Sequence, residues 1–275
     1  ADEIDNDFII STMVGRNLSN RFPERTNVPG DVVMRIENFS SPSPKSFKNI
    51  TFELRKGEIL GIGGLVGAQR TELVEALFGL RTHSTGNIYI NGKTVRIKSP
   101  IDAIKHKMAL LTEERRTTGI FPVLPVIENI TIANLASYLK PYLLLDEKRR
   151  KKAAEDSISR LRIKTPSYKT LIKNLSGGNQ QKALIAKWLL TEPEILILDE
   201  PTRGIDVGAK YEIYTIINEL ATQGKSIIMI SSEMPELLGM SDRIMVMCEG
   251  KLSGIIEGKD ATQEEVMRLA TKFIA

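Results

Sequence analysis

The sequence has little of several things that would mark a specialised class of protein. A single cysteine among 275 residues rules out an internal disulfide and suits a reducing compartment. Because Cys248 follows the apolar run Ile244–Met247, we expect its thiol to be buried and unreactive. Aromatic residues make up only 5% of the chain, which leaves few side chains for stacking on nucleic-acid bases. No nucleic-acid partner is therefore expected.

The sequence also lacks a hydrophobic run long enough to cross a bilayer, for which about 18 apolar residues are needed. Asn129–Leu145 comes nearest, but Asn134, Lys140 and Pro141 interrupt it. The amino-terminal residues ADEIDNDFII are acidic and unlike a secretion signal. We expect a soluble protein that reaches a membrane only through a partner.

Charge of one sign is not in large excess, since the formal net charge is +4. The positive residues are scattered in short clusters such as Lys148–Lys152 (KRRKK). A basic cluster can bind nucleic acid or anionic lipid. This one falls in an amphipathic segment, so we interpret it as a solvated helix face.

The patterns that are present alternate between strand and helix, as in an α/β fold with a parallel sheet. Residues 1–30 have the composition of a leader and linker, in which Ile4–Leu18 could form a short helix. Residues of about 115–185 are predicted to be a helical insertion. The other predicted elements are strands at Asp31–Asn38, Ile50–Leu54, Met108–Leu111, Ile195–Leu198 and Ile227–Ile230, a strand–turn–strand at Gly86–Ile97, a hairpin near Ile244–Ile256, and helices at Ile101–His106 and Tyr211–Gln223.

The most informative segment is a glycine-rich turn between a predicted strand and a predicted helix, within Gly57–Gly79. Phosphate-binding loops have the pattern G-x-x-x-x-G-K-[ST], in which backbone N–H groups surround the phosphates. Gln69 replaces the second glycine and Arg70 the lysine, whereas the first and last positions fit. A vestigial loop that only packs is the alternative to a phosphate site. The candidate phosphate-binding residues are Gly64, Gly67, Ala68, Gln69, Arg70, Thr71 and Glu72.

The two replacements predict an altered site. A planar guanidinium at Arg70 keeps the charge but is bulkier than an ammonium group. Gln69 stands where the backbone must approach the phosphates, at a position that favours a left-handed conformation costly for a non-glycine residue. We expect nucleotide binding in weakened or altered form, and no fast hydrolysis.

An acidic pair and a second glycine motif follow. Asp199 and Glu200 come directly after the apolar run Ile195–Leu198, at the carboxyl end of a strand, where open parallel sheets place their ligand sites. Thr71 and Asp199 would share Mg²⁺, with Glu200 as general base; a surface acid pair is the alternative. The motif LSGGN could bind an anion at a helix start through Ser176, Gly177, Gly178 and Asn179, or could be a helix cap without a ligand.

Together these segments resemble the ATP-binding-cassette (ABC) ATPases, specifically the carboxyl-terminal cassette of the fused, two-cassette ATPase subunits of bacterial monosaccharide importers. Within that family they look closest to the galactose and methyl galactoside importers, with the ribose and xylose importers as near alternatives. The resemblance covers essentially the whole chain. The motifs are Met13–Arg16 (MVGR), Gly64–Ala68 (GLVGA), Leu111–Arg116 (LTEERR), Leu175–Lys182 (LSGGNQQK), Leu198–Lys210 (LDEPTRGIDVGAK) and Ser231–Leu238 (SSEMPELL).

The resemblance implies an α/β fold, a P-loop NTPase cassette with a RecA-like, mostly parallel core sheet, an antiparallel β subdomain and an inserted helical subdomain, within a nucleotide-binding domain at residues 31–275. It implies ATP and Mg²⁺ as cofactors. Glu113 stands where most cassettes have a glutamine that contacts Mg²⁺ and the permease, and Ser232 where most have a histidine that contacts the γ-phosphate. Together with Arg70, these departures imply a weak or inactive site.

Other residues have weaker assignments. Gly204–Asp206 corresponds to the loop that crosses the cassette dimer. No adenine-stacking aromatic is evident; Phe47 is a candidate, although a core role fits it better. His83 and His106 do not lie at the γ-phosphate position, so surface or packing roles are expected.

Cassettes of this family pair head to tail, so LSGGN of this chain would complete the site of an amino-terminal cassette of the same polypeptide, absent here. Residues 1–30 would be the tail of that cassette and its linker. The other implied partners are membrane permease subunits, contacted around Gly119–Glu128, and indirectly a sugar-binding receptor, at the cytoplasmic face of the membrane. A catalytically degenerate regulatory half remains an alternative. A cassette of DNA repair or translation would be expected to show long coiled-coil heptads or a strongly basic arm, and this sequence has neither.

Overall fold

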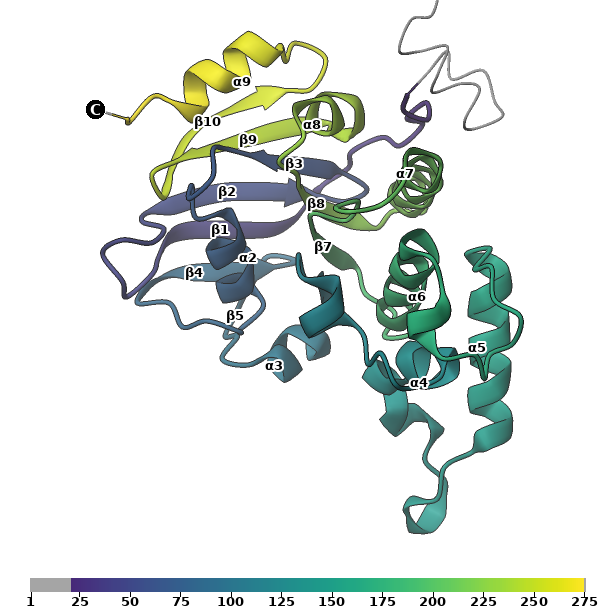
Figure 1. Ribbon diagram of the computed structural model, residues 1–275. Helices are drawn as coiled ribbons and strands as arrows, with labels where there is room; N and C mark the ends of the chain where they lie inside the picture. The colour runs from purple at the N-terminus through teal and green to yellow at the C-terminus, as the bar shows by residue number, and fades with distance from the viewer. Residues whose placement is uncertain (1–20, 275) are drawn as a thin grey trace, which may run out of the picture.

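The computed structural model describes residues 21–274, which form two sheets surrounded by helices (Figure 1). The predicted helix Ile4–Leu18 and the motif Met13–Arg16 lie outside the described residues. The strands are β1 (Val32–Ser40), β2 (Ile50–Arg55), β3 (Ile59–Gly63), β4 (Thr85–Ile90), β5 (Lys93–Val95), β6 (Met108–Leu111), β7 (Ile195–Asp199), β8 (Ser226–Ile230), β9 (Arg243–Cys248) and β10 (Lys251–Glu257). The α-helices are α2 (Arg70–Leu77), α3 (Pro100–Lys105), α4 (Val126–Thr131), α5 (Glu147–Arg160), α6 (Gly177–Leu189), α7 (Val207–Thr222), α8 (Met234–Met240) and α9 (Gln263–Ala270).

The larger sheet has the strand order β10-β9-β3-β8-β7-β6, and all of its neighbouring pairs are parallel except β10 with β9. Every residue of β3, β7 and β8 is buried, because both faces of the sheet are covered. Successive residues point to opposite faces. Ile228 and Ile230 of β8 pack in one core cluster with α2 and the smaller sheet, whereas Ile227 and Met229 pack in a second cluster with α6 and α7.

The smaller sheet is antiparallel, with the order β2-β1-β4-β5. Helices α4 and α5 extend away from both sheets, and α6 lies between them and the larger sheet (Figure 1). The predicted fold class is therefore confirmed: a mostly parallel core sheet, an antiparallel β subdomain and an inserted helical subdomain. The sequence patterns located the strands, but we did not predict α8 and α9.

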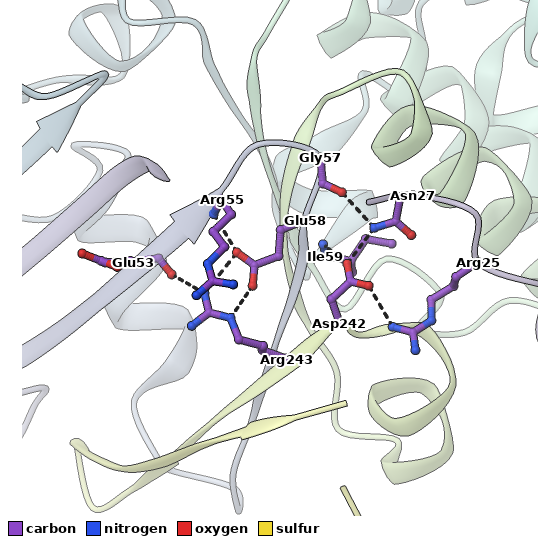
Figure 2. A network of polar contacts seen from close by, with 9 residues as sticks. All are labelled: Arg25, Asn27, Glu53, Arg55, Gly57, Glu58, Ile59, Asp242 and Arg243. Carbon is purple, nitrogen blue, oxygen red and sulfur yellow. Dashed lines mark hydrogen bonds and ion pairs between the residues drawn. The ribbon is translucent and has the colours of Figure 1, made fainter. Parts of the chain in front are cut away.

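Residues 21–30 lie against the domain, although their composition is that of a linker. Asp242, which precedes β9, accepts hydrogen bonds from Arg25 Nη1 (3.2 Å), from Asn27 Nδ2 (2.7 Å) and from the backbone N–H of Ile59 (2.8 Å), as Figure 2 shows. Asn27 Nδ2 also donates to the Gly57 carbonyl at 2.8 Å. The segment is thus fixed at the amino ends of β3 and β9.

The aromatic ring of Phe22 fixes the same segment nearer to its amino end. It packs on the ring of Tyr214 in α7 with 5.1 Å between centroids. A Cβ atom on Gly239 of α8 would lie 2.3 Å from Phe22 Cδ2, so the glycine is required for this contact. Asn218 Nδ2 donates to the Pro23 carbonyl at 3.2 Å. Helices α7 and α8 therefore provide the surface for residues 22–24.

A buried ion pair joins the two sheets beside this segment (Figure 2). Arg243 donates to both carboxylate oxygens of Glu58, through Nε at 2.5 Å and Nη2 at 3.1 Å, and Nη2 also donates to the Glu53 carbonyl at 2.8 Å. Burial disfavours the guanidinium, but Glu58 outweighs it and the pKa of Arg243 is raised. The turn between β2 and β3 is thus tied to β9 by a bidentate pair.

The interpretation of Lys148–Lys152 as a solvated face is wrong at one position. Arg150 is only 4% exposed. Its guanidinium pairs with Glu128 of α4 and with Glu147 (3.0 Å), so it joins α5 to α4. The other four residues of the cluster are exposed.

Three smaller predictions are confirmed. Cys248 is buried, with a free thiol. Phe47 is a core residue, stacked on Phe39 with 5.5 Å between ring centroids. His83 has a packing role, with 4.6 Å between its ring centroid and that of Phe39. Within residues 21–274, every helix is too short or too polar to cross a membrane.

Candidate functional site

The predicted site residues follow the carboxyl ends of four neighbouring parallel strands. Gly64 follows β3, Glu113 lies two residues after β6, Asp199 ends β7 and Ser232 lies two residues after β8. Because β8 lies between β3 and β7, the glycine loop and the acidic pair flank the residues that follow β8. This edge of a parallel sheet is where ligand sites are found.

The glycine loop runs from Gly64 to Gln69 and leads into α2. A Cβ atom on Gly64 would lie 2.5 Å from the Met247 carbonyl, so this position requires glycine. Gly67 has φ +85°, and no atom of the described residues lies within 4 Å of where its Cβ would be, which leaves open space next to the backbone. Ala68 is buried, and its N–H donates to the Leu65 carbonyl at 3.0 Å. The loop has the form of a phosphate-binding turn at a helix start.

Gln69 adopts the left-handed conformation that we expected, with φ 69° and ψ 31°. Its side-chain Nε2 donates to the Gly67 carbonyl at 3.1 Å, so the amide lies back along the loop. Arg70, Thr71 and Glu72 form the first turn of α2, where backbone N–H groups have no intrahelical acceptor. Those N–H groups are available to an anion.

Arg70 does not extend freely from the loop. Its Nη1 donates to the Ser231 carbonyl at 3.1 Å. Burial lowers the pKa of Arg70, while the charges of Glu200 and Asp199 oppose this. The guanidinium therefore lies between the β8 loop and the two carboxylates. Its partner could not be found from the sequence.

Asp199 is the most unusual group of the site. It is 1% exposed, and within residues 21–274 its Oδ1 has no hydrogen-bond partner. Burial, with the nearby charge of Glu200, raises the pKa of Asp199 to about 7, against a hydrogen bond with Thr71 and the charge of Arg70. A buried carboxylate oxygen without a partner is costly unless a cation or donor meets it. Asp199 and Thr71 therefore fit the oxygen ligands that Mg²⁺ prefers.

Glu200 and Ser232 contact each other. Burial raises the pKa of Glu200, and hydrogen bonds from the side chain and backbone of Ser232 oppose that effect. Glu200 is half-buried and has a left-handed φ of 48°. A half-buried carboxylate with a raised pKa suits a proton acceptor.

Glu113 has a different partner from the one its position suggested. Its carboxylate pairs with Arg203, which also lies 3.6 Å from Glu114. Glu113 and Thr71 both line a cleft of about 730 Å³ between α2, α3, β6 and α6. The assignment of Glu113 to a metal remains a prediction.

The motif LSGGN lies apart from this site. Asn179 Nδ2 donates to Ser176 Oγ at 2.9 Å, and Asn179 Oδ1 accepts from the Lys164 N–H at 2.8 Å. A Cβ atom on Gly178 would lie 2.5 Å from Ala209 Cβ, and one on Gly177 would lie 3.2 Å from an Arg115 nitrogen. Close approach of α6 to α7 therefore explains Gly178 structurally.

The opposite end of α6 is the end that approaches the glycine-loop helix. Trp188 packs edge-on against Phe78, which follows α2, with 5.8 Å between ring centroids. About 16 Å of helix separates Trp188 from Gly177. The chain therefore does not bring its two candidate anion-binding motifs together.

A glycine loop that starts a helix, an acidic pair two strands away and a helical insertion define a nucleotide-binding cassette of the P-loop class. The sequence model of the family described as "ABC transporter" matches residues 47–203, more than half of the chain. The chain therefore belongs to the ABC transporter family.

Two curated relatives share the name galactose/methyl galactoside import ATP-binding protein MglA. That of Clostridium tetani is 66% identical over 274 residues, covering 100% of this chain and 54% of the relative. That of Haemophilus influenzae is 55% identical over 266 residues, covering 97% of this chain and 53% of the relative. The chain spans about half the length of the curated relatives it matches.

Solved structures show the same fold at low sequence identity. A nucleotide-free ATP-binding cassette from an ABC transporter is 20% identical, with a TM-score of 0.74 over 88% of this chain and 96% of that one. An ATP-binding cassette in its ADP conformation has a TM-score of 0.73 and 20% identity over 89% of this chain and 96% of that one.

Proposed function

We propose that this chain binds ATP with Mg²⁺ and forms one half of an ATPase that drives import of a monosaccharide, galactose or a methyl galactoside, through a membrane permease. The observation that carries the nucleotide assignment is the unpartnered, buried Oδ1 of Asp199 next to Thr71, at the end of the glycine loop. The names of the relatives support the sugar class. The chain would act at the cytoplasmic face of the membrane, held there by the permease.

Each group of the site has a role in this proposal. The open backbone at Gly67 and the free N–H groups of Arg70–Glu72 would bind phosphate oxygens. Thr71 and Asp199 would hold Mg²⁺, which neutralises phosphate charge when bound. Glu200 would accept the proton of the attacking water. Arg70 would keep Nη1 on the Ser231 carbonyl and offer its other guanidinium N–H groups to a phosphate oxygen.

Two partners complete the proposal. A second cassette would cover the site and use Ser176–Asn179 of this chain for its own nucleotide, which agrees with the distance between the two motifs. The permease would dock at the cleft of about 730 Å³ lined by Glu113. Phe121 and Val123, which lie in the segment predicted to contact the permease, are 46% and 71% exposed. A sugar-binding receptor would act only through the permease.

A second candidate is a regulatory half that binds nucleotide and does not hydrolyse it. Arg70 is engaged with Ser231, and Ser232 hydrogen-bonds to Glu200, so both groups expected near the γ-phosphate already have protein partners. This candidate shares the fold and the nucleotide with the first and differs in turnover.

The test measures ATP binding and turnover with Mg²⁺ on the unmodified chain, on Glu200→Gln and on the double variant Gln69→Gly/Arg70→Lys, which restores the P-loop pattern. We expect ATP binding by all three proteins. Turnover should fall by a factor of about 100 or more in Glu200→Gln, because a general base contributes that much. It should rise in the double variant.

The outcomes separate the candidates. Binding without turnover in the unmodified chain, with turnover in the double variant, supports the regulatory half. Turnover that Glu200→Gln leaves unchanged would show that Glu200 is not the base. If the unmodified chain binds no ATP, the proposed nucleotide site is wrong.

A further inference from the structure

Glu236 of α8 is a buried carboxylate without an assigned role. It is 1% exposed, and its two oxygens accept four hydrogen bonds. Oε1 accepts from Thr202 Oγ1 (2.6 Å), from Tyr214 OH (2.6 Å) and from Lys210 Nζ (3.1 Å). Oε2 accepts from Ser231 Oγ at 2.7 Å.

These donors come from three separate segments. Thr202 lies in the loop after β7, Lys210 and Tyr214 lie on α7, and Ser231 directly follows β8. Burial disfavours the carboxylate, but the three hydroxyl groups and Lys210 outweigh burial, and the pKa of Glu236 is lowered. A charged carboxylate with four donors holds all three segments in one arrangement.

Ser231 connects this carboxylate to the nucleotide site. Its hydroxyl donates to Glu236 and accepts from the Glu233 N–H at 3.0 Å. Its carbonyl accepts from Arg70 at 3.1 Å. The next residue, Ser232, hydrogen-bonds to Glu200. The position of Ser231 therefore sets where Arg70 and Ser232 lie.

Phe22 of the leading segment, residues 21–30, is linked to the same carboxylate through Tyr214. The ring of Phe22 packs on Tyr214, whose hydroxyl donates to Glu236. The loop Gly204–Asp206 lies between two of the donors, Thr202 and Lys210. Glu236 thus joins α7 to the β8 loop, and Tyr214 connects it to the leading segment.

We propose that Glu236 is a positioning residue of the nucleotide site, which fixes the Ser231–Ser232 segment so that Arg70 and Ser232 meet the γ-phosphate of bound ATP. Glu236 itself touches no nucleotide. The inference rests on the proposed function, since it assigns the discrimination of ATP from ADP within that same site. The affinity for a nucleotide without a γ-phosphate should not change when Glu236 is replaced.

The experiment compares calorimetric affinities for Mg²⁺–ADP and for the non-hydrolysable β,γ-imido analogue of ATP. The variant Glu236→Gln has the same size, but its amide nitrogen cannot accept the Ser231 hydroxyl proton. We expect the analogue to bind about tenfold more weakly and ADP to change less than twofold. Glu233→Gln is the matched control, because Glu233 is exposed on the same turn, its side chain pairs with Lys210, and the variant keeps the backbone bond to Ser231.

A milder variant guards against loss of the fold. Tyr214→Phe removes one donor to Glu236 and keeps the ring against Phe22, so it should weaken analogue binding in the same direction by a smaller factor. If the two variants weaken the binding of ADP and of the analogue equally, or leave both affinities unchanged, Glu236 is a structural residue and the inference is wrong. If the unmodified chain binds neither nucleotide, the proposed function fails first.

Discussion

Gln69 and Arg70 show how far single residues could be predicted. The left-handed conformation of Gln69 (φ 69°) follows from its place in the P-loop pattern, because that place belongs to a local turn. The partner of Arg70 does not follow from any pattern. Ser231 is 161 residues away and presents a carbonyl group, which every residue has. The sequence thus predicted the backbone conformation of the loop but not the hydrogen bond that the Arg70 guanidinium makes.

The pKa of Asp199, raised from 3.8 to about 7, predicts a pH-dependent stability of the ligand-free protein. The unfolded chain ionises at lower pH than the folded one, so the folded state loses stability as pH rises through this range. Asp199→Asn removes the ionisation. Without Mg²⁺ or nucleotide, we expect the variant to be more stable at pH 8, by up to about 4 kcal/mol.

Urea unfolding at pH 5 and pH 8 measures this difference. The advantage of Asp199→Asn should shrink by more than half at pH 5, where folded Asp199 is already protonated. Thr71→Val is a control that alters the same contact without removing the acid. An advantage that does not depend on pH would contradict the raised pKa.

Among the elements, strands were predicted better than helices. Continuous apolar runs such as Ile195–Leu198 are buried on both faces and stand out from their surroundings. Helix α9 was missed although Thr262 caps it, accepting from the Glu265 N–H at 3.2 Å, in the T-x-x-E pattern of a capping box. Helix α8 has seven residues, too few for a clear periodicity. Capping residues would have found α9.

In helix α5 the basic composition of Lys148–Lys152 led us to predict that all five residues are exposed, although Arg150 is buried. Arg150 lies four residues before Ala154, so the two share the inward face of the helix. Arg150→Ala should lower the free energy of unfolding by about 2–3 kcal/mol, since it removes the charge partner of Glu128 and leaves a cavity.

Lys151→Ala on the same helix is the matched control. Lys151 is exposed; it pairs with Glu155 at 3.7 Å and lies 5.3 Å from the centre of the Tyr168 ring. Both contacts are open to solvent, so its loss should cost less than about 1 kcal/mol. Chemical unfolding of both variants gives the comparison. Equal effects would mean that Arg150 does not join α5 to α4.

The whole molecule depends on pairings between distant parts of the chain. Strand β3 lies between β8 and β9, so that Ile59 pairs with Ile227 and Leu60 with Arg243. The sequence predicted a parallel sheet but not its strand order, because each buried strand is similarly apolar. It also did not predict that residues 21–30 lie on the domain, because their contacts use single polar groups and one ring.

Asp242 should be the main attachment of that segment. Asp242→Ala removes the acceptor of Arg25, Asn27 and the Ile59 N–H, and should cost about 2–3 kcal/mol. Trypsin should then cleave faster after Arg25. Arg25→Ala removes one partly exposed contact and should cost less than about 1 kcal/mol. Cleavage after Arg21 in the same digest is the reference. If cleavage after Arg25 stays unchanged in Asp242→Ala, the segment is held by its other contacts, such as those of Phe22 and Asn218, and Asp242 is not its main attachment.

The same attachment has a consequence for the timing of synthesis. Arg25 and Asp242 are 217 residues apart, and Asn218, which holds the Pro23 carbonyl, is 195 residues away from it. A ribosome that adds about 5–20 residues per second needs about 10–40 s to cover that distance. During this interval residues 22–27 have left the ribosome before the helices that receive them exist. A nascent chain stalled before α7 should therefore leave this segment open to proteases and chaperones. The segment can be covered only after α7 and α8 have left the ribosome.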